Sequence, residues 1–459
     1  MNPVAVDKHT KEFLYHKDSG FLFTKQLINA LPKEWRYTVL VPTGFDRRFF
    51  PTDHVIECVP YDYCTSIHQN RYHFNRNILA LFMSYAMDFD VVLNNQPESA
   101  ANILTYFRVQ RRENPLIINF FHWIDCKESA ANAPELTGYI WRQIEGVLFA
   151  DKSYFHTEHA RKLFDDYVNT VVGKKFEYDY GCFHPLPTMF GDEKMELPQK
   201  KIILFNHRMR DTTGWKEVVD ICIKLSKKRD DFVLWITDEN IPKDGEFVKQ
   251  YKFIMNKSVS ANSYAYLMKN SHFSICNTKG YATWNMSVLD SVVNGCLPLV
   301  INKPLYHEMF PTGDIFFDDL GITIEKHLNN TREENVKKLN DVTIAEHDLS
   351  SIVDSIYKIL RGRVENHNVA KYGSVVDFIK SENVLVKNGS NLDTFFSGAR
   401  SDVGVCKKVD FVHGLWKWAT NHTFQTIRWK LLFDGIKDDI TQRETTYCIT
   451  LEELEKKKN

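Results

Sequence analysis

Along this chain, segments with the hydrophobic pattern of buried strands alternate with segments that have the pattern of helices. In the first half, short apolar runs predict buried strands, and segments with apolar residues every three or four positions predict the helices between them. The predicted strands cover residues 37–42, 55–59, 90–94 and 116–121, the predicted helices cover 75–87, 98–107 and 137–147, and a strand–helix pair covers 152–167. Such an alternation predicts an α/β fold with a parallel sheet that is covered by helices on both faces.

Residues 178–200 interrupt this pattern and predict a linker, because prolines and a glycine cluster there. A second alternation follows, with predicted strands at 201–205, 232–237 and 252–254, predicted helices at 215–227 and 263–270, and a charged helical stretch from about 325 to 363. We therefore predict three parts: an N-terminal lobe at residues 1–190, a second lobe at 200–365, and a C-terminal helical segment at 366–459 that packs back on the first lobe.

The stretch from residue 272 to 310 predicts a parallel βαβ unit. Residues 272–276 form an apolar strand, a helix starts at about Asn285 and stops at Asn294-Gly295, and residues 297–301 form the next strand. Such units bind their ligands where strands end and helices begin. Asp290 is a polar residue inside this helix, close to its start, and therefore becomes a candidate for ligand binding.

This stretch resembles the donor-binding lobe of retaining GT-B glycosyltransferases. The run ATWNMSVLDSVVNGCLPLV at 282–300 is similar to the family's ETFGISVVEA run followed by GC-P, and PLYHEMFP at 304–311 is similar to its proline–tyrosine–glutamate segment. Asp290 stands at the second of the family's two acids, which binds ribose, whereas Ala282 stands at the first and is not acidic. The resemblance implies a GT-B fold, with two Rossmann-like lobes facing a central cleft, the acceptor on the first lobe and the nucleotide sugar on the second.

Composition narrows the class of protein. A net charge of -1 over 459 residues provides no global attraction to nucleic acid or to membranes. The nine cysteines include no C-x2-C pair, which argues against structural zinc and against a disulfide framework. No apolar run reaches about 18 residues, and no signal peptide is evident. We expect a soluble, monomeric, cytoplasmic protein (in the host cytoplasm if phage-encoded).

Two short motifs are set aside. The acidic pair in Asp88-Phe89-Asp90 matches a metal-binding string of another glycosyltransferase class, but it precedes its predicted strand instead of following one. No G-x-G-x-x-G or phosphate-loop lysine motif occurs, so nicotinamide and ATP chemistry lack a binding motif. The resemblance implies a nucleotide-sugar donor, with UDP as the favoured nucleotide, and no obligatory metal.

Glycosyl transfer builds negative charge on the departing diphosphate, so the site needs fixed positive charge there. Arg208 follows a predicted strand and matches the family's phosphate-binding arginine. Thr213 replaces the family's lysine before Gly214, and Lys216 lies just beyond it. The resemblance thus implies a clamp of Arg208 and Lys216, with Arg210 as a substitute; the alternative is that these are ordinary surface side chains.

The start of the predicted helix provides a second phosphate site. The backbone amides of Asn285, Met286 and Ser287 are expected to face a phosphate, supported by the helix dipole. Asp290 would then accept hydrogen bonds from the ribose hydroxyls. The alternative is an aspartate on the surface of a helix.

In the first lobe, His122 and Asp125 end a buried strand. Retaining relatives often place a histidine there against the donor sugar, so both are predicted catalytic residues, together with Arg208. The alternative for His122 is a histidine of the core. Ser19-Gly20, before a helix from Phe21, resembles the flexible loop that closes over donor and acceptor.

Basic residues interleaved with aromatics suggest a nucleic-acid acceptor. The predicted contacts are Arg47, Arg48, Arg108, Arg111, Arg112, Lys417, Arg428 and Lys430. For the C-terminal group, packing of an amphipathic tail is an equal alternative.

The stretch resembles tRNA-nucleoside-modifying members of the family, and the chain's character resembles bacteriophage enzymes that glycosylate hydroxymethylated cytosine in DNA. We expect retaining glycosyl transfer of a hexose or pentose to a modified nucleobase, with 5-hydroxymethylcytosine in phage DNA first. The alternatives are a tRNA nucleoside or saccharide acceptor, or a non-catalytic module that binds nucleotide sugar or nucleic acid.

Overall fold

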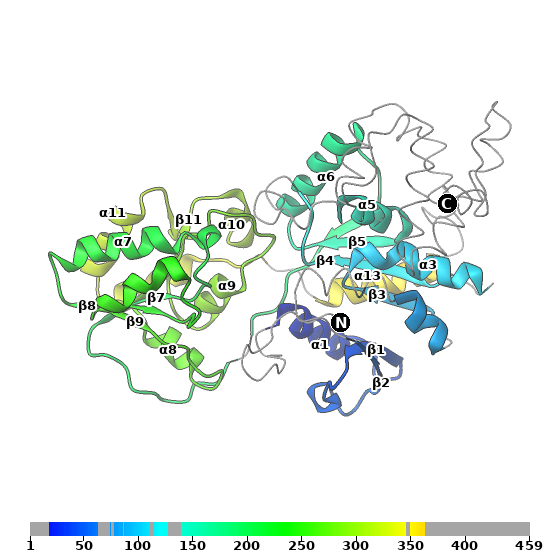
Figure 1. The fold of residues 1–459 in the computed structure, drawn as a ribbon, viewed down its shortest axis with the longest axis horizontal. Coiled ribbons are helices and arrows are strands. Elements are labelled where there is room, and N and C mark those ends of the chain that lie inside the picture. The colour runs from blue at the N-terminus through cyan, green and yellow to red at the C-terminus, as the bar shows by residue number, and fades with distance from the viewer. Residues whose placement is uncertain are drawn as a thin grey trace, which may run out of the picture. The chain divides into compact units, whose positions relative to one another are not determined.

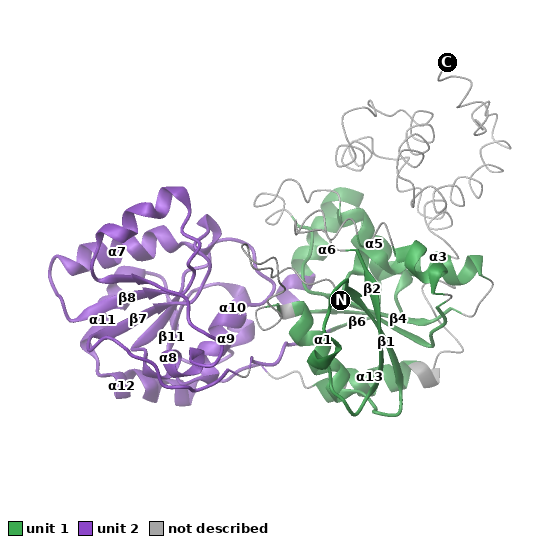
Figure 2. Ribbon diagram, turned by 60° about the horizontal axis from the view of Figure 1, so that its bottom comes forward, with its two compact units in different colours: residues 1–155, 162–181, 349–459 green, residues 156–161, 182–348 purple. Residues whose placement is uncertain are grey.

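The computed structural model describes residues 18–62, 74, 78–85, 87–110, 114–126, 139–188, 190–345 and 349–362. The chain divides into two compact units, which are coloured separately in Figure 2. Unit 1 comprises residues 1–155, 162–181 and 349–459, and unit 2 comprises residues 156–161 and 182–348. Among the described residues, no helix is long and apolar enough to cross a membrane.

Unit 1 contains two sheets. Strands β1 (Arg36–Pro42) and β2 (Val55–Tyr61) form a parallel pair. The second sheet has the order β3-β4-β5-β6, with β3 at Val91–Asn94, β4 at Leu116–Phe121, β5 at Lys152–Phe155 and β6 at Tyr180–Cys182. All six residues of β4 are buried, as expected for a parallel strand that is covered on both faces.

The helices of unit 1 surround these sheets (Figure 1). They are α1 (Ser19–Ala30), α3 (Ala100–Val109), α5 (Tyr139–Phe149), α6 (Glu158–Val172) and α13 (Leu349–Gly362), with 3-10 turns η2 (Arg47–Phe49) and η3 (Pro97–Ser99). Residues 78–84 are helical too. The domain boundaries predicted from the sequence assign α13 to the second lobe, whereas the structure places it in unit 1, where the Tyr357 ring lies 5.6 Å from that of Trp35. The predicted C-terminal part, 366–459, lies outside the described residues.

Unit 2 has one parallel sheet of six strands in the order β12-β11-β10-β7-β8-β9. The strands are β7 (Lys201–Phe205), β8 (Phe232–Ile236), β9 (Ile254–Asn256), β10 (Phe273–Cys276), β11 (Pro298–Ile301) and β12 (Phe316–Phe317). The helices are α7 (Trp215–Ser226), α8 (Tyr264–Asn270), α9 (Met286–Val293), α10 (Pro304–Met309), α11 (Leu320–Asn329) and α12 (Arg332–Lys337), with 3-10 turns η5 (Asp211–Thr213), η6 (Lys243–Gln250) and η7 (Lys338–Asp341). The predicted βαβ unit is therefore present.

The sheet of unit 2 buries side chains on both faces. Along β7, Ile203 and Phe205 join the core formed with α7 and α11, while Ile202 and Leu204 join a second core formed with α8. Figure 1 shows α7 and α8 on opposite sides of the sheet. Each fully buried aliphatic or phenyl side chain contributes about 1.5–3 kcal/mol, so this double burial fixes the strand positions and the edge at which they end.

Candidate functional site

The sheet of unit 2 reverses its strand order between β7 and β10. The chain continues from β7 to β8 and β9 on one side, then returns to add β10, β11 and β12 on the other. The loops after β7 and β10, residues 206–214 and 277–285, therefore leave the carboxyl edge in opposite directions. Parallel α/β sheets bind their ligands at such a point, which makes this edge the candidate site of unit 2.

Direct contacts hold the two loops in place. The Asn206 side-chain amide donates to the Ser287 carbonyl oxygen at 3.0 Å and to the Ser291 hydroxyl at 3.2 Å. Gly214 has φ 66°, and a Cβ there would lie 2.4 Å from the Asn277 carbonyl oxygen. The Asn277 side-chain amide donates back to the Gly214 carbonyl oxygen at 3.2 Å. Only glycine fits this close approach, which joins the loop after β7 to the loop after β10.

The amino end of α9 lies at this edge. Asn285 is its N-cap residue, in an extended conformation, but its side chain does not cap the helix. Instead, the Asn285 amide donates to the Tyr306 hydroxyl at 3.1 Å and to the Cys276 thiol at 3.3 Å. No described residue accepts a hydrogen bond from the backbone amide of Met286 or Ser287. These amides are therefore available to an anion, and the phosphate contact stays a prediction.

Two exposed arginines follow β7. The loop that carries them is held by Thr213, whose hydroxyl donates to the carbonyl oxygens of Arg208 and Arg210 at 2.7 Å each. The amide of the intervening Met209 donates to Asp238 at 2.9 Å. Both arginine side chains are exposed, so a fixed backbone presents two guanidinium groups to solvent beside the switch point.

Lys216 is placed differently from its predicted role. Its ammonium lies 2.8 Å from Asp211 and 2.5 Å from Asp244. Hydrogen bonds to these two carboxylates raise the pKa of Lys216. Its positive charge is thus already matched by two acids of its own unit, which weakens the case for Lys216 as part of a phosphate clamp.

Asp290 is buried under the segment that precedes β7. Only 5 % of this residue is exposed, and the Thr188 backbone amide donates to its carboxyl oxygen at 3.2 Å. Burial raises the pKa of Asp290 to about 7, against the lowering effect of the Thr188 hydrogen bond. The surface-aspartate alternative does not hold. The predicted ribose contact requires the covering segment to release this carboxyl.

Ala282, which stands at the first of the family's two acid positions, makes apolar contacts. Ala282 is partly buried and packs against the main core of unit 2. Its methyl group offers no hydrogen bond at this edge. If the donor is held at this position by an acid in the family, this chain must hold it with another residue or lack that contact.

A thiol–imidazole pair lies at the same edge. Cys276, at the end of β10, is fully buried, and its thiol donates to the Tyr306 hydroxyl at 3.1 Å. Burial acts to raise the pKa of Cys276, but the adjacent His207 together with the Tyr306 and Thr278 hydroxyls outweighs this effect and lowers it. His207 is 9 % exposed, and its Nε2 has no partner among the described residues. The sequence analysis missed both residues, although His207 stands directly before Arg208.

His122 lies at the carboxyl edge of the β3-β4-β5-β6 sheet, as predicted. It follows β4 directly and is half-buried. Its Nε2 lies 3.3 Å from the Asn95 side-chain oxygen, and its ring packs edge-on against Phe23 with 5.0 Å between centroids. The ring thus has a fixed orientation at the edge where a parallel sheet binds ligands.

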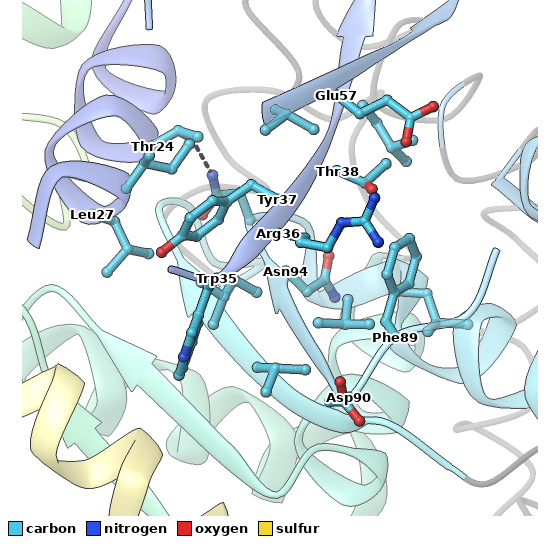
Figure 3. A pocket seen from close by; sticks show the side chains of 18 of the residues that line it. Thr24, Leu27, Trp35, Arg36, Tyr37, Thr38, Glu57, Phe89, Asp90 and Asn94 are labelled. Atoms are coloured by element: carbon cyan, nitrogen blue, oxygen red, sulfur yellow. Dashed lines mark hydrogen bonds between the residues drawn. The ribbon is translucent and has the colours of Figure 1, made fainter. Parts of the chain in front are cut away.

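Unit 1 also contains a cavity of about 1010 Å³ between the β1-β2 pair and β3. Figure 3 shows the rings of Trp35, Tyr37 and Phe89 around it, with Arg36 and Asp90 near them. No hydrogen-bonded ladder joins β1 to β3 in the described part of the chain, so the two sheets are separate and their side chains line the space between them. No sequence pattern indicated this cavity.

Comparison with solved structures identifies the fold. A trehalose-6-phosphate synthase, OtsA, superposes with a TM-score of 0.56 at 11% sequence identity, covering 78% of this chain and 97% of that one. The N-terminal domain of a Candida albicans trehalose-6-phosphate phosphatase gives a TM-score of 0.55 at 12% identity, covering 75% and 93%. A UDP-forming α,α-trehalose-phosphate synthase from Burkholderia xenovorans gives 0.50 at 13% identity, covering 65% and 80%.

The fold is that of the GT-B glycosyltransferases. This confirms the fold class expected from the sequence. No family model matches the chain, and no curated protein matches it significantly. At identities of 11–13%, the likeness extends to the fold and does not transfer an activity or a substrate.

Asp125, which the sequence analysis predicts as a catalytic residue, makes structural contacts in unit 1. It is fully buried, and its carboxylate accepts a hydrogen bond from the Ile140 backbone amide at 2.8 Å, in the first turn of α5. Its own backbone amide donates to the Gln143 side chain at 2.8 Å. The carboxylate therefore satisfies a backbone amide in the first turn of a helix inside the core.

The predicted Ser19-Gly20 loop is part of a helix. α1 begins at Ser19, and the Asp18 carboxylate accepts a hydrogen bond from the Phe21 amide at 2.8 Å. An aspartate N-cap of this kind starts the helix two residues earlier than the sequence analysis expected. A closing loop over donor and acceptor is not formed by these residues.

The predicted nucleic-acid contacts separate into three groups. Arg47 is committed to its own loop, because its guanidinium donates at 3.0–3.4 Å to the carbonyl oxygens of Phe50, Pro51, His54 and Ile56. Arg48 pairs with Asp46 at 2.7 Å, and Arg108 is exposed in the last turn of α3. Outside the described residues lie Arg111, Arg112, Lys417, Arg428 and Lys430.

Carboxylates and other metal-binding side chains do not cluster in the described part of the chain. No group of three or more His, Cys, Asp or Glu residues there could hold a metal ion. Asp90 directly precedes β3, in the position that its sequence context suggested.

Proposed function

We propose that this chain transfers a sugar, with retention, from a UDP-sugar to a hydroxyl group of a modified nucleobase, first of all 5-hydroxymethylcytosine in phage DNA. One observation supports the donor half of this proposal. At the switch point between β7 and β10, the amides of Met286 and Ser287, which have no acceptor among the described residues, lie at the same sheet edge as the exposed Arg208. The GT-B fold, and one neighbour that is described as a UDP-forming trehalose-phosphate synthase, support a UDP-sugar donor.

In this proposal, the site works mainly through fixed positive charge. The diphosphate binds at the amino end of α9, where backbone amides and the helix dipole favour an anion. Arg208, with Arg210 beside it, stabilises the negative charge that grows as the sugar departs. Asp290 binds the ribose after the segment at Thr188 has moved, and His122 contacts the donor sugar.

The acceptor half is supported by the sequence resemblance and by basic residues. Arg108 is exposed on unit 1, and the remaining basic residues lie outside the described part of the chain. The charge of Arg48 is matched by Asp46, and the guanidinium of Arg47 donates four hydrogen bonds within its own loop region. DNA binding by this chain therefore depends on Arg108, Arg111 and Arg112 and on the C-terminal group.

Nucleoside mass spectrometry tests the whole proposal. DNA and RNA containing modified nucleosides are incubated with the full chain and a pool of nucleotide sugars. The nucleic acids are then digested to nucleosides, and the nucleoside masses are measured. A mass increase of one hexose or pentose on a DNA nucleoside is expected, and it should be lost in Arg208→Ala. A mass increase on a tRNA nucleoside or on an added saccharide would identify that molecule as the acceptor instead. UDP binding without any transfer would indicate a non-catalytic module.

Salt dependence tests the contact with DNA separately. Each lysine or arginine that neutralises a phosphate contributes about 0.9 to the slope of log affinity against log salt. Replacing Lys417, Arg428 and Lys430 with alanine should flatten that slope by up to about 2.7 and leave UDP affinity unchanged. A lower melting temperature with an unchanged slope would instead assign these side chains to packing.

A further inference from the structure

The cavity of unit 1 has mostly apolar and aromatic walls. Its volume of about 1010 Å³ is at the upper end of the range for ligand sites, about 300–1,000 Å³. Its walls come from α1, β1, β2, β3 and α3 and from the helical residues 74, 78 and 82, and the rings of Tyr37 and Phe89 face it from two sides (Figure 3). Flat, apolar walls of this kind favour a planar ring over a hydrated, hydroxyl-rich ligand.

One buried polar group in this cavity has unused hydrogen-bonding capacity. Gln96 lines the cavity at the carboxyl end of β3, is 4 % exposed, and its Oε1 has no partner among the described residues. An unpaired buried amide oxygen costs about 1–3 kcal/mol unless a ligand satisfies it.

The neighbouring Asn94 is already satisfied. Its side-chain amide donates to Asn119 at 2.8 Å, and its oxygen accepts hydrogen bonds from the Gln96 backbone amide and the Ser99 hydroxyl. A saccharide would therefore meet too few buried partners for its hydroxyl groups, whereas a heterocycle needs partners only along one edge.

The cavity also reaches the carboxyl edge where His122 lies. Asn95 lines the cavity, donates to the Thr24 hydroxyl at 2.8 Å, and has its side-chain oxygen 3.3 Å from His122 Nε2. A ligand held between the strands would thus end beside the residue predicted to contact the donor sugar.

We propose that this cavity is the acceptor site, and that it holds a nucleobase whose hydrogen-bonding edge is read by the side-chain amide of Gln96. The inference rests on the proposed function, because it names where the acceptor of that reaction binds. A base that is stacked between apolar side chains and read at its edge by an amide is how enzymes that act on bases recognise them.

The base can come from a free nucleoside or from a nucleic-acid strand. The exposed side chains that line the cavity carry one positive charge, on Arg36, against three negative charges, on Glu57, Asp88 and Asp90. Phosphate groups are disfavoured beside such a cluster, so the experiment compares both sources.

Binding of 5-hydroxymethyl-2′-deoxycytidine tests the inference without turnover. Calorimetry on the full chain, without donor, should detect binding, and Trp35 emission should change, with the change lost in Trp35→Phe. Gln96→Ala should weaken binding about 10-fold, the scale of one neutral hydrogen bond. Gln110→Ala, an exposed glutamine at the end of α3, is the matched control and should bind as the wild type does.

A second variant covers the case in which Gln96→Ala fails to fold. Thr38 lies on β1 and lines the cavity, so Thr38→Trp should fill the space and abolish binding. If the nucleoside binds equally well to Gln96→Ala and Thr38→Trp, both folded, the cavity is not its site.

Two further experiments distinguish a free nucleoside from DNA as the source of the base, and the proposed site from the proposed function. A single-stranded oligonucleotide containing the same base should compete with the nucleoside if the base is taken from DNA; a nucleoside that binds alone identifies a free nucleoside as the source. Maltose should not compete, and competition by maltose would overturn the nucleobase assignment. Nucleoside binding without sugar transfer would refute the proposed function and keep the site, whereas transfer that is unaffected by Gln96→Ala and Thr38→Trp would refute the site alone.

Discussion

Replacing Asp290 with asparagine should stabilise the fold and weaken donor binding at the same time. Burial raises the pKa of this carboxyl from its ordinary 3.8 to about 7. The folded chain therefore favours the neutral form, whereas the unfolded chain titrates near pH 4. Below about pH 4 both states are protonated and the group has no effect on stability. Between about pH 4 and 7 ionisation increasingly favours unfolding, and above pH 7 the full cost is present.

The magnitude follows from the shift. From 3.8 to about 7 is roughly 3 pKa units, and each unit corresponds to about 1.36 kcal/mol, so the upper bound is about 4 kcal/mol. Asparagine has nearly the same shape, and its oxygen can still accept the hydrogen bond from the Thr188 amide, so little else changes. Asp290→Asn should therefore be more stable than the wild type by up to about 4 kcal/mol at pH 8.

Urea unfolding of the full chain between pH 4 and 8 measures this difference. The advantage of the variant should grow with pH, and Asp220→Asn, an exposed aspartate on α7, should show no such trend. UDP should bind the variant at least 10-fold more weakly, because a hydrogen bond to a charged group is worth about 1.5–3 kcal/mol. A stability difference that does not vary with pH would refute the burial argument, and an unchanged UDP affinity would remove Asp290 from the donor site.

Three other substitutions give independent checks. Arg208→Ala should lower kcat at least about 100-fold with a smaller effect on KM, and steady-state kinetics that show only a raised KM would refute its role at the transition state. Gly214→Ala should destabilise the chain by about 2 kcal/mol or more, because its Cβ would meet backbone atoms; Gly295→Ala, with a similar φ but nothing within 4 Å, should cost about 1 kcal/mol in the same urea series. Asp125→Ala should lower stability by about 1–2 kcal/mol as a lost helix cap and leave the pH profile of transfer unchanged, whereas a shifted profile would return it to the catalytic groups.

Local patterns predicted the elements of this fold well. The helix stop at Gly295 and the buried strands of unit 2 follow from side-chain period and from one residue's conformational freedom, both of which are visible in a short window of sequence. The switch point can be predicted in part from the sequence, because its two loops belong to predicted strand–helix units. Their adjacency depends on β10 pairing with β7 across the sheet, which no local pattern encodes.

The roles of single side chains were harder to predict because distant residues decide them. The charge of Lys216 is neutralised in part by Asp244, which lies in the 3-10 turn η6. The buried carboxylate of Asp125 accepts a hydrogen bond from the amide of Ile140. His207 becomes notable only because Cys276, on a different strand, is its neighbour. In each case, tertiary packing sets the partner of the side chain, and the sequence around the residue does not show that partner.

The cover over Asp290 leads to a last expectation about the donor site. The Thr188 amide binds one oxygen of this carboxyl, and only 5 % of Asp290 is exposed, so a ribose has little access to it in the present geometry. If UDP engages Asp290, the segment at 186–188 must release it, and hydrogen exchange in a peptide covering that segment should become faster when UDP is added. Exchange at the start of α9 should become slower, because the amides of Met286 and Ser287 then bind phosphate. Slower exchange at α9 with no change at 186–188 would show that the diphosphate binds as proposed while the ribose lies elsewhere.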